Sequence, residues 1–468
     1  MIRKLQLLVV LLLFLPLGSA AQEPAGVWEG TLSMDAASLR LVFRIAASPD
    51  GYTATLDSPD QGVRGIPVDS VAFRGGELTF RIGALNASFR GNLLPGGMLM
   101  GEFVQFGRSS MLLFTRREAP RRPQTPQPPF PYATREVTFP SRAAGVTLAG
   151  TLTLPDSLPL RAAVVLVTGS GLQNRDEELF DHKPFWVIAD YLTRRGIAVL
   201  RYDDRGFGAS EAEQRALLAD ATTADFALDA LGAVDWLRAQ PGFDAVRIGI
   251  LGHSEGGTIA FLAAAEEPAV AFVVSLAGGL VPGGRLSLLQ NRRAMELQGL
   301  DAPMIDVCCR LIGRCHAMLR ATPLAELPGR LSALKAELSA DPEVQALPET
   351  LRTHILRLLD GAAASPWVYH FLTFDPSEAI RRTGDRPVLA LNGALDRQVD
   401  AGVNLGAVRR LLGDSELLTV KEYPSLNHLF QHCTTGDVAE YETIEETFSP
   451  AVLADLAAWI GSLRPLGE

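Results

Sequence analysis

The sequence lacks the features that would place it in several specialised classes of protein. Its 468 residues carry 43 basic and 53 acidic side chains, and this net charge of −10 does not suit nucleic acid or an anionic membrane surface. Its four cysteines form no CxxC pair and no Cys/His cluster with zinc-site spacing, so we expect no structural metal. The remaining composition, 47% hydrophobic and 21% charged, is that of a globular protein with two or three folded units.

Long apolar runs are also scarce. The first residues, MIRKLQLLVVLLLFLPLGSAAQ, contain an apolar run from Leu5 to Leu17, which is shorter than the ~20 residues of a membrane-spanning helix. A positive start and small residues at the end of this stretch are typical of a secretory signal. We therefore expect residues 1–21 to be a signal peptide that is removed. This predicts export to the bacterial periplasm or medium, without a stable membrane anchor.

Apolar and polar side chains alternate between residues 22 and 117. In SLRLVFRI every second residue is apolar, ELTFRI repeats the period, and Gly, Asp and Pro turns separate such runs. The pattern predicts a small all-β domain, an antiparallel sheet or barrel with one buried face. This part contains no histidine, so we expect it to have a structural or substrate-facing role rather than a catalytic one.

A change of pattern follows a proline-rich stretch. Residues 118–134 contain too much proline for a strand or a helix, which predicts a stiff linker. Beyond it, AAVVLVTGSG and VRIGILGHSEGG are typical of strands buried on both faces, and helical patterns such as TTADFALDALGAVDWLRAQP alternate with them. The alternation predicts an α/β domain with a mostly parallel sheet over residues 135–468.

The alternation of strands and helices is interrupted between residues 283 and 371. This segment is rich in Leu, Ala, Glu and Arg at helical spacing and has no strand-like run. It follows the end of a strand, where loops build the active sites of α/β proteins. We expect a helical cap insertion that selects the substrate and takes no part in the chemistry.

The stretch GHSEGG places Ser254 at the turn from a buried strand into a helix. Gly252 and Gly256 remove β-carbons that would clash in so sharp a turn. The backbone N–H of Glu255, at the start of the helix, would point towards negative charge on a carbonyl oxygen. We expect the carboxylate of Glu255 to cap that helix. The G-x-S-x-G pattern alone is weak, because a serine nucleophile also needs a base and an acid.

The base and the acid follow from the positions of the strands. His428 lies in the loop directly after the last expected strand, and His432 lies four residues further on. PVLALNGALDRQVD offers Asp396 and Asp400 after an earlier strand, and the nearer turn position favours Asp396. The preferred set is Ser254, Asp396 and His428, which is the chain order of α/β-hydrolases. His432 and Asp400 are the alternatives.

A second donor to the oxyanion should lie in the loop after the first buried strand, TGSGLQNRDEE. Ser170 and Gly171 are the candidates, each through its backbone N–H. The other interpretation of this loop is a plain glycine turn.

Together these stretches resemble a known family. From about Arg135 onward, TGSGLQNRDEE, YDDRGFGAS, GHSEGG, NGALDRQVD and LNHLFQ are similar to the α/β-hydrolase superfamily, and within it to bacterial exported esterases grouped with serine-aminopeptidase-like hydrolases. Such proteins often carry a β domain ahead of the core. The resemblance implies esterase chemistry on Ser254, Asp396 and His428, with a small-molecule ester as substrate and no metal or organic cofactor. In YDDRGFGAS we expect the charged residues to fix a turn near the site.

Two other functions remain open. One is a peptidase or aminopeptidase that uses the same three residues. The other is a secreted binding protein in which the β domain acts and the hydrolase part is inactive. Turnover of a p-nitrophenyl ester separates the binding protein from both enzymes, and turnover of an aminoacyl anilide separates the enzymes from each other.

The cysteines allow one further expectation. Cys308 and Cys315, seven residues apart on a helix, are too distant to form a disulfide with each other. Cys433 follows His428 closely, so a disulfide from Cys433 to the insertion, which also contains Cys309, would tether the insertion beside the site.

Overall fold

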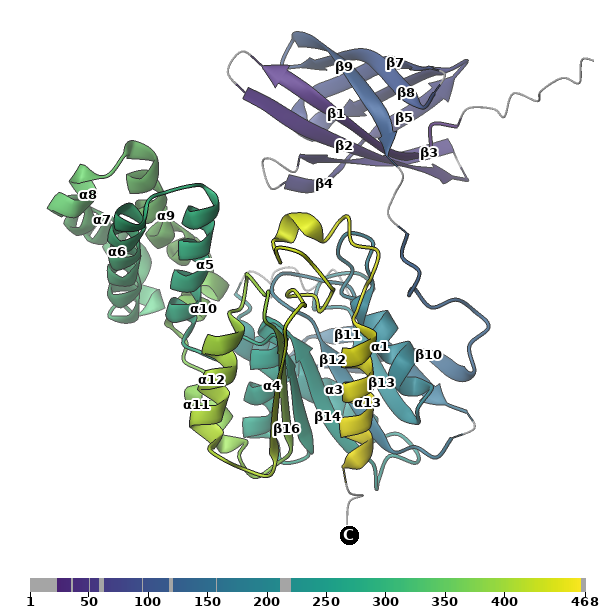
Figure 1. The fold of residues 1–468 in the computed structure, drawn as a ribbon, viewed down its shortest axis with the longest axis vertical. Helices are drawn as coiled ribbons and strands as arrows, with labels where there is room; N and C mark the ends of the chain where they lie inside the picture. The colour runs from purple at the N-terminus through teal and green to yellow at the C-terminus, as the bar shows by residue number, and fades with distance from the viewer. Residues whose placement is uncertain are drawn as a thin grey trace, which may run out of the picture. The chain divides into compact units, whose positions relative to one another are not determined.

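The computed structural model describes residues 23–34, 37–49, 51–58, 63–94, 96–117, 121–156, 158–210 and 220–463. The expected signal peptide, residues 1–21, lies outside them. The chain divides into two compact units, residues 1–120 and residues 121–468, coloured purple to blue and blue to yellow (Figure 1). No described helix combines the length and the apolar character needed to cross a membrane.

The first unit is an antiparallel sheet, as its alternating pattern predicts. Its strands are β1 (Gly26–Met34), β2 (Ala37–Ser48), β3 (Gly51–Ser58), β4 (Val63–Pro67), β5 (Ser70–Arg74), β6 (Glu77–Ile82), β7 (Ala87–Leu94), β8 (Met98–Gln105) and β9 (Arg108–Arg117). They are hydrogen-bonded in the order β4-β3-β2-β1-β9-β8-β7-β6-β5. One face is buried over an aromatic cluster, in which Phe80 lies 4.2 Å from Phe43 and 5.0 Å from Phe89 between ring centroids. Such pairs add to the stability gained from burial.

The second unit contains a mostly parallel sheet. Its strands are β10 (Tyr132–Pro140), β11 (Thr147–Pro155), β12 (Ala162–Val167), β13 (Ile197–Tyr202), β14 (Arg247–His253), β15 (Phe272–Leu276), β16 (Val388–Gly393) and β17 (Leu418–Tyr423). The order is β10-β11-β13-β12-β14-β15-β16-β17, with β10 and β11 antiparallel to their neighbours and the others parallel. This confirms the predicted α/β-hydrolase fold.

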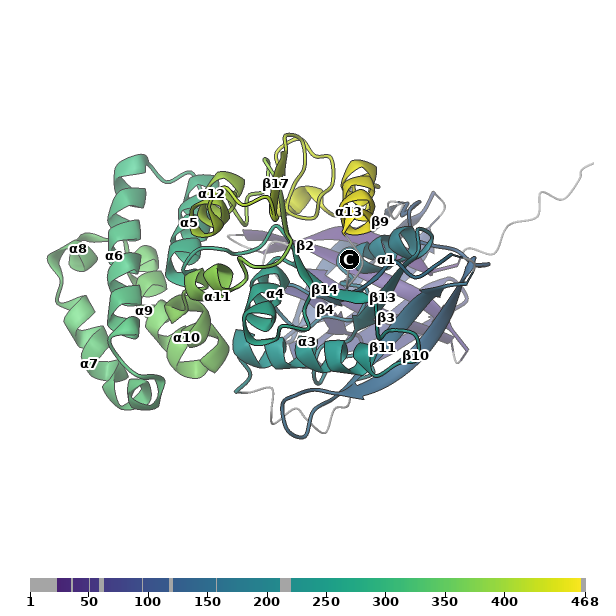
Figure 2. The ribbon, with the colours of Figure 1, turned by 90° about the horizontal axis from the view of Figure 1, so that it is seen from below.

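Helices cover both faces of this sheet. They are α1 (Pro184–Thr193), α3 (Thr223–Arg238), α4 (Glu255–Glu266), α11 (Ser377–Arg382), α12 (Ala401–Leu412) and α13 (Pro450–Ser462). One apolar layer holds α3, α4, α11 and α12 against the sheet, and another holds α1 and α13 against the opposite face (Figures 1 and 2). Because β12 lies between β13 and β14, the chain continues from β12 to β13 on one side and from β14 to β15 on the other. A crevice therefore opens at the carboxyl ends of β12 and β14, where α/β sheets bind ligands.

The segment between β15 and β16 is helical, in agreement with the predicted insertion. It contains α5 (Gly283–Leu297), α6 (Ala302–Arg320), α7 (Leu327–Ser339), α8 (Pro342–Ala346), α9 (Glu349–Ala364) and α10 (Pro366–Thr373), so its helices run two residues beyond the expected end at 371. These helices gather beside α11 and α12 (Figure 2). They enclose an apolar core of their own, built around Leu311, Leu338 and Leu359.

The expected disulfide between Cys433 and the insertion is wrong, because all four cysteines are free thiols. Cys308 and Cys315 lie on the inner face of α6 and are 1% and 0% exposed within the core of the insertion, where they pack as small apolar side chains. Burial raises the pKa of Cys315 to about 12. The Sγ atom of Cys433 instead contacts the backbone oxygen of Ser425 at 3.8 Å.

The proline-rich stretch differs from the expected linker. From residue 121 on it belongs to the second unit and packs against it. The guanidinium of Arg122 donates to the backbone carbonyls of Phe180 and Ile444, each at 2.8 Å. The side-chain amide of Gln124 donates to the backbone carbonyl of Phe448 at 2.7 Å. The first strand of this unit then begins at Tyr132. The hydrolase unit therefore begins earlier than residue 135, because polar side chains among the prolines bind it.

Candidate active site

Ser254 occupies a strained turn between β14 and α4. Its φ of 55° and ψ of −120° place it in a region that non-glycine residues rarely adopt, at a cost of ~1–3 kcal/mol. The turn needs its glycines, since a β-carbon on Gly252 would lie 1.8 Å from the carbonyl oxygen of Gly256. The backbone N–H of Ser254 donates to the carbonyl of Leu276 at 2.8 Å, which ties the turn to β15. A surrounding structure that enforces such strain is typical of a functional position.

The structure places His428 beside Asp396. The Nδ1 atom of His428 lies 2.7 Å from Oδ2 of Asp396, and the Asp396 side chain is fully buried. The other carboxylate oxygen accepts from the backbone N–H groups of Gln398 and Val399, each at 2.8 Å. These three contacts fix the orientation of the carboxylate. Because Nδ1 is engaged, Nε2 is the nitrogen left for a proton from a substrate or nucleophile.

Ser254 and His428 line the same cavity, which has a volume of about 750 Å³. The two alternative residues have other partners. Asp400 caps α12 by accepting from the backbone N–H of Val403 at 2.7 Å. His432 pairs with Glu446 at 2.8 Å, and its side chain is 59% exposed. Of the four candidates for base and acid, the geometry therefore favours His428 and Asp396.

The two candidate oxyanion donors of the loop after β12 lie in different places. Ser170 lines the cavity, whereas Gly171 lines a small hollow beneath the loop. The loop passes close to the nucleophile, since a β-carbon on Gly169 would lie 3.1 Å from Cβ of Ser254. Within the described part of the chain, no residue accepts a hydrogen bond from the backbone N–H of Ser170 or of Glu255. The pair that suits an oxyanion is thus Ser170 with Glu255.

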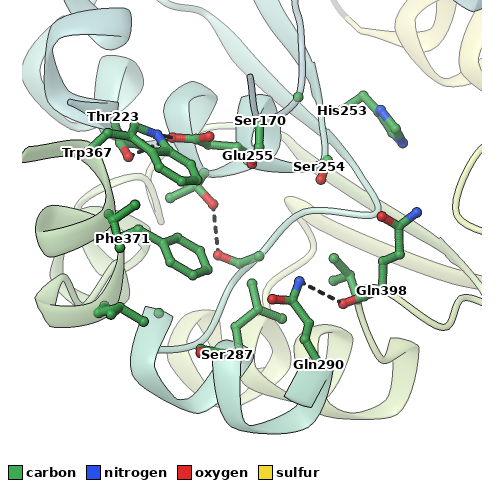
Figure 3. Close-up of a pocket in the computed structure, with 18 of the residues that line it drawn as sticks. Ser170, Thr223, His253, Ser254, Glu255, Ser287, Gln290, Trp367, Phe371 and Gln398 are labelled. Atoms are coloured by element: carbon green, nitrogen blue, oxygen red, sulfur yellow. Dashed lines mark hydrogen bonds between the residues drawn. The ribbon is translucent and has the colours of Figure 1, made fainter. Parts of the chain in front are cut away.

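The side chain of Glu255 does not cap α4, which corrects the expectation from the sequence. Its Oε1 atom accepts from the hydroxyl of Thr223 at 2.7 Å and from the indole N–H of Trp367 at 2.9 Å (Figure 3). Thr223 begins α3 and Trp367 lies on α10 of the insertion. The carboxylate projects sideways from the first position of α4 and meets donors that lie far away in the sequence. It therefore links the helix after Ser254 to the insertion.

Two residues that the sequence analysis missed support this site from behind. The Nε2 atom of His253 lies 2.9 Å from the carbonyl oxygen of His428, and its Nδ1 atom lies 2.9 Å from Oε1 of Glu177. The same Oε1 accepts from the backbone N–H of Gly169 at 3.0 Å. The carboxylate of Glu177 thus connects the loop of His428, through His253, to the loop after β12. The acidic residues of NRDEE, which follow the glycines of the loop after β12, were the feature of the sequence that could have pointed to Glu177.

The charge state of His253 follows from these contacts. A carbonyl and a carboxylate both accept hydrogen bonds, so each ring nitrogen carries a proton and His253 forms an ion pair with Glu177. Burial opposes this charge, but the negative charge and hydrogen bond of Glu177 outweigh it and raise the pKa of His253.

The charged residues of YDDRGFGAS hold the same loop, as expected. Asp204 accepts from the hydroxyl of Thr168 at 2.9 Å and from the backbone N–H of Gln173 at 2.7 Å. Burial raises the pKa of Asp204 to about 8. The side chain of Arg205 pairs with Asp229 of α3 at 2.7 Å. The contacts of Asp204 fix the loop after β12, and the pair of Arg205 with Asp229 ties the YDDRGFGAS segment to α3.

The insertion supplies part of the cavity wall. The apolar and aromatic side chains that line it include Leu286, Leu358, Trp367, Val368, Phe371 and Leu372. Trp367 and Phe371 are stacked, with ring centroids 5.5 Å apart and planes 8° from parallel. Figure 3 shows both rings and Ser254 bordering the same space. A concave apolar site of this size suits a small molecule.

Comparisons with known proteins agree with this architecture. Residues 183–431, just over half of the chain, match the family described as "Serine aminopeptidase, S33". An esterase of Thermotoga maritima, EstD, is 37% identical over 112 residues, 24% of this chain and 26% of that protein. A polyketide transferase of Penicillium sp, grgF, is 32% identical over 186 residues, 38% of this chain and 61% of that protein. The chain thus matches less than two thirds of the length of either relative. A crystal structure of an esterase from Pyrococcus furiosus aligns over 74% of this chain and 96% of that one, with 13% identity and a TM-score of 0.41.

Proposed function

The chain belongs to the serine aminopeptidase S33 family of α/β-hydrolases, and we propose that it hydrolyses small carboxylic esters through an acyl-enzyme on Ser254. One observation carries the proposal. His428 and Asp396 are joined by a 2.7 Å hydrogen bond. His428 and the strained residue Ser254 line the same, largely apolar cavity. A serine, a base and an orienting acid in this arrangement form the machinery of acyl transfer.

The reaction would proceed in two halves. The Oγ atom of Ser254 attacks the ester carbonyl while Nε2 of His428 takes its proton, and Asp396 stabilises the imidazolium that forms. The backbone N–H groups of Glu255 and Ser170 receive the developing oxyanion. Collapse of this intermediate breaks the C–O bond, and His428 returns the proton to the departing alcohol. Water then attacks the acyl-enzyme with the same base, which releases the acid and restores the serine.

The cavity wall supports an ester with an apolar acyl group. An apolar acyl group would bury its surface against the stacked rings of Trp367 and Phe371 and the neighbouring leucines. Such burial favours binding by roughly 25 cal/mol per Å² of apolar surface removed from water. EstD of Thermotoga maritima, which shares part of the sequence, is an esterase by name. Peptidase activity is the second candidate, because the carboxylates of Glu178 and Glu255 also line the cavity and would suit the ammonium group of an amino-terminal residue.

Export also belongs to the proposal. It rests on residues 1–21, whose charged start, apolar run and small-residue end are those of a secretory signal. Comparing the N-terminus of the protein recovered from the periplasm or medium with that of the protein in the cytoplasm tests it. Recovery of the uncleaved chain from the cytoplasm alone would contradict export.

The test of the activity is a substrate panel combined with active-site labelling. Purified protein should turn over p-nitrophenyl esters of graded acyl length much faster than aminoacyl anilides, and a fluorophosphonate should label Ser254. Ser254→Ala should lower kcat by several powers of ten, as expected for loss of such a nucleophile. Ser170→Ala is the matched control, since it removes a serine hydroxyl from the same cavity but leaves the backbone donor.

Each alternative outcome is distinct. Faster turnover of aminoacyl anilides than of esters would show that the protein is a peptidase rather than an esterase. Labelling at another residue, or an active Ser254→Ala variant, would reject the acyl-enzyme on Ser254. Intact folding of both variants is checked by their thermal unfolding midpoints.

A further inference from the structure

A second cavity lies within the helical insertion. It has a volume of about 390 Å³, many times the ~30 Å³ of one water molecule, and lies between the start of α5, the end of α6 and the segment after α10. Leu372 and Phe374 line both this cavity and the one at Ser254. Gly283 borders the larger cavity and Gly284 the smaller, so the two are separated by one thin wall.

A buried histidine without a partner lines this cavity. His316 of α6 is 1% exposed, and neither of its ring nitrogens meets hydrogen-bond geometry with a described residue. Burial and the positive charge of Arg320 lower its pKa to about 4, although a contact with the backbone of Gly284 opposes this shift. The ring is therefore neutral near pH 7, with one N–H donor and one acceptor. Leaving a buried polar group unsatisfied is unfavourable, so a ligand that provides the missing partner gains affinity.

Two arginines also border the cavity without a counter-ion. Neither Arg285 nor Arg320 forms an ion pair with any residue in the described part of the chain. Arginines elsewhere on the same two helices do, since Arg292 pairs with Asp306 and Arg310 with Glu343, each at 2.7 Å. The chain has ten more acidic than basic side chains, so carboxylates are not scarce as possible partners for these arginines. Among the described residues that line the cavity, the one acid is Asp375, and its Oδ1 accepts from the backbone N–H of Ser377 at 2.9 Å.

The start of α5 faces the same cavity. This 15-residue helix begins after Pro282, which has no side chain that can cap it, and its first turn contains no acidic residue. The backbone N–H of Gly284 has no acceptor among the described residues. Arg320 and His316 lie close to Gly284, since a β-carbon there would lie 3.2 Å from Nη1 of Arg320 and 3.3 Å from Nδ1 of His316, as well as 3.0 Å from the carbonyl oxygen of Leu372. The positive end of a helix favours an anion.

We propose that this cavity is a binding site for a small anion, whose carboxylate or phosphate oxygens are held by Arg285, Arg320, the N–H of Gly284 and the ring of His316. Two guanidinium groups match the geometry of such oxygens. The buried imidazole sets this place apart from a bare helix end, because it needs a partner that the protein does not provide. The proposal is independent of the reaction at Ser254, since none of these four residues lines the larger cavity.

The test is binding of inorganic phosphate alone and of acetate alone, measured by calorimetry at constant ionic strength. The wild-type protein should bind at least one of them at a single saturable site, and the tighter ligand distinguishes phosphate from carboxylate recognition. Arg285→Gln and Arg320→Gln should each weaken binding about tenfold or more. Arg292→Gln is the matched control, because it removes the same charge from α5 at a side chain that pairs with Asp306, and it should bind within about twofold of wild type.

Prior labelling of Ser254 with a small phosphonate should leave the affinity for the anion unchanged. The proposal is overturned if neither anion shows saturable binding to the wild-type protein. It is also overturned if Arg292→Gln weakens binding as much as Arg320→Gln, which would indicate a general effect of charge, or if the phosphonate blocks binding, which would place the anion beside Ser254. Both arginine side chains are exposed, so their variants should keep the wild-type unfolding midpoint.

Discussion

His253 and His316 are both buried, yet one is fully paired and the other has no partner. His253, at the end of β14, has a carbonyl and a carboxylate as acceptors for its two nitrogens. His316, in the insertion, has none in hydrogen-bonding geometry. The comparison indicates two kinds of site. At the carboxyl ends of β12 and β14 the polar groups are held in place before a substrate arrives, whereas in the insertion they are arranged for a molecule that has yet to bind.

The largest expected effect tests whether the prearranged site is catalytic. Asp396→Asn should lower kcat by about four powers of ten, because the amide cannot stabilise the imidazolium of His428 and favours the wrong ring tautomer. Asp400→Asn is the control at the neighbouring carboxylate, which caps α12. Its stability and activity should stay near those of wild type, because Asn caps a helix about as well as Asp. Ester turnover by the two variants decides between them. A more damaging Asp400→Asn would reverse the assignment of the acid.

A smaller effect tests the support behind that site. Glu177→Gln keeps the size of the side chain but removes the charge that holds His253, so the loops of His428 and Gly169 lose a common anchor. Small misplacements of reacting groups cost up to about a hundredfold, so kcat should fall about 10- to 100-fold with KM nearly unchanged. The rate of fluorophosphonate labelling should fall in parallel. Glu178→Gln, the exposed neighbour that lines the cavity, should keep kcat near wild type. Equal losses of kcat in both variants would contradict a positioning role for Glu177.

The smallest effect concerns acid stability, and it has opposite signs for the two histidines. The folded pKa of His316, about 4, lies below the ordinary value of 6.5, so the unfolded chain takes up this proton first as the pH falls. Stability present above pH 6.5 is therefore lost between about pH 6.5 and 4. The pKa of His253 is raised, so its pairing stabilises the fold below pH 6.5 and is lost as the pH rises through the raised value.

Unfolding midpoints between pH 4.5 and 7.5 measure this difference. His316→Gln should flatten the acid side of the profile by a few degrees, because the titrating group is gone. His354→Gln, at an exposed histidine of α9, is the control and should follow the wild-type curve. A profile for His316→Gln that also follows the wild-type curve would show that burial of this ring does not lower its pKa.

The sequence predicted the parts of the molecule that depend on local pattern and chain order. Period-two alternation gave the antiparallel sheet, and buried runs alternating with helices gave the parallel one. The turn at Ser254 needs glycines within two residues of it, and His428 and Asp396 follow the ends of strands, so all three could be located from the sequence. The insertion was recognised because its helical spacing continues for about ninety residues without a strand.

Contacts between distant segments could not be predicted in this way. The role of His253 could not be predicted, because its position beside Glu177 depends on how closely the loop after β12 approaches β14. The hydrogen bond from the indole of Trp367 to the carboxylate of Glu255 joins residues 112 positions apart. The disulfide failed for a similar reason: the rotation of α6 turns Cys308 and Cys315 into the core of the insertion, and spacing alone does not define that rotation.

The Glu255–Trp367 hydrogen bond has a consequence for how this protein can be re-engineered or can diverge. The insertion is continuous in sequence between two strands, so exchanging it for another helical segment would be the simplest route to a new specificity. Such a graft must still provide a donor where the indole of Trp367 lies. Without it, the carboxylate next to the nucleophile keeps Thr223 as its remaining partner. One position of the insertion, Trp367, is therefore tied to the turn at Ser254, and chimaeras should keep a hydrogen-bond donor there.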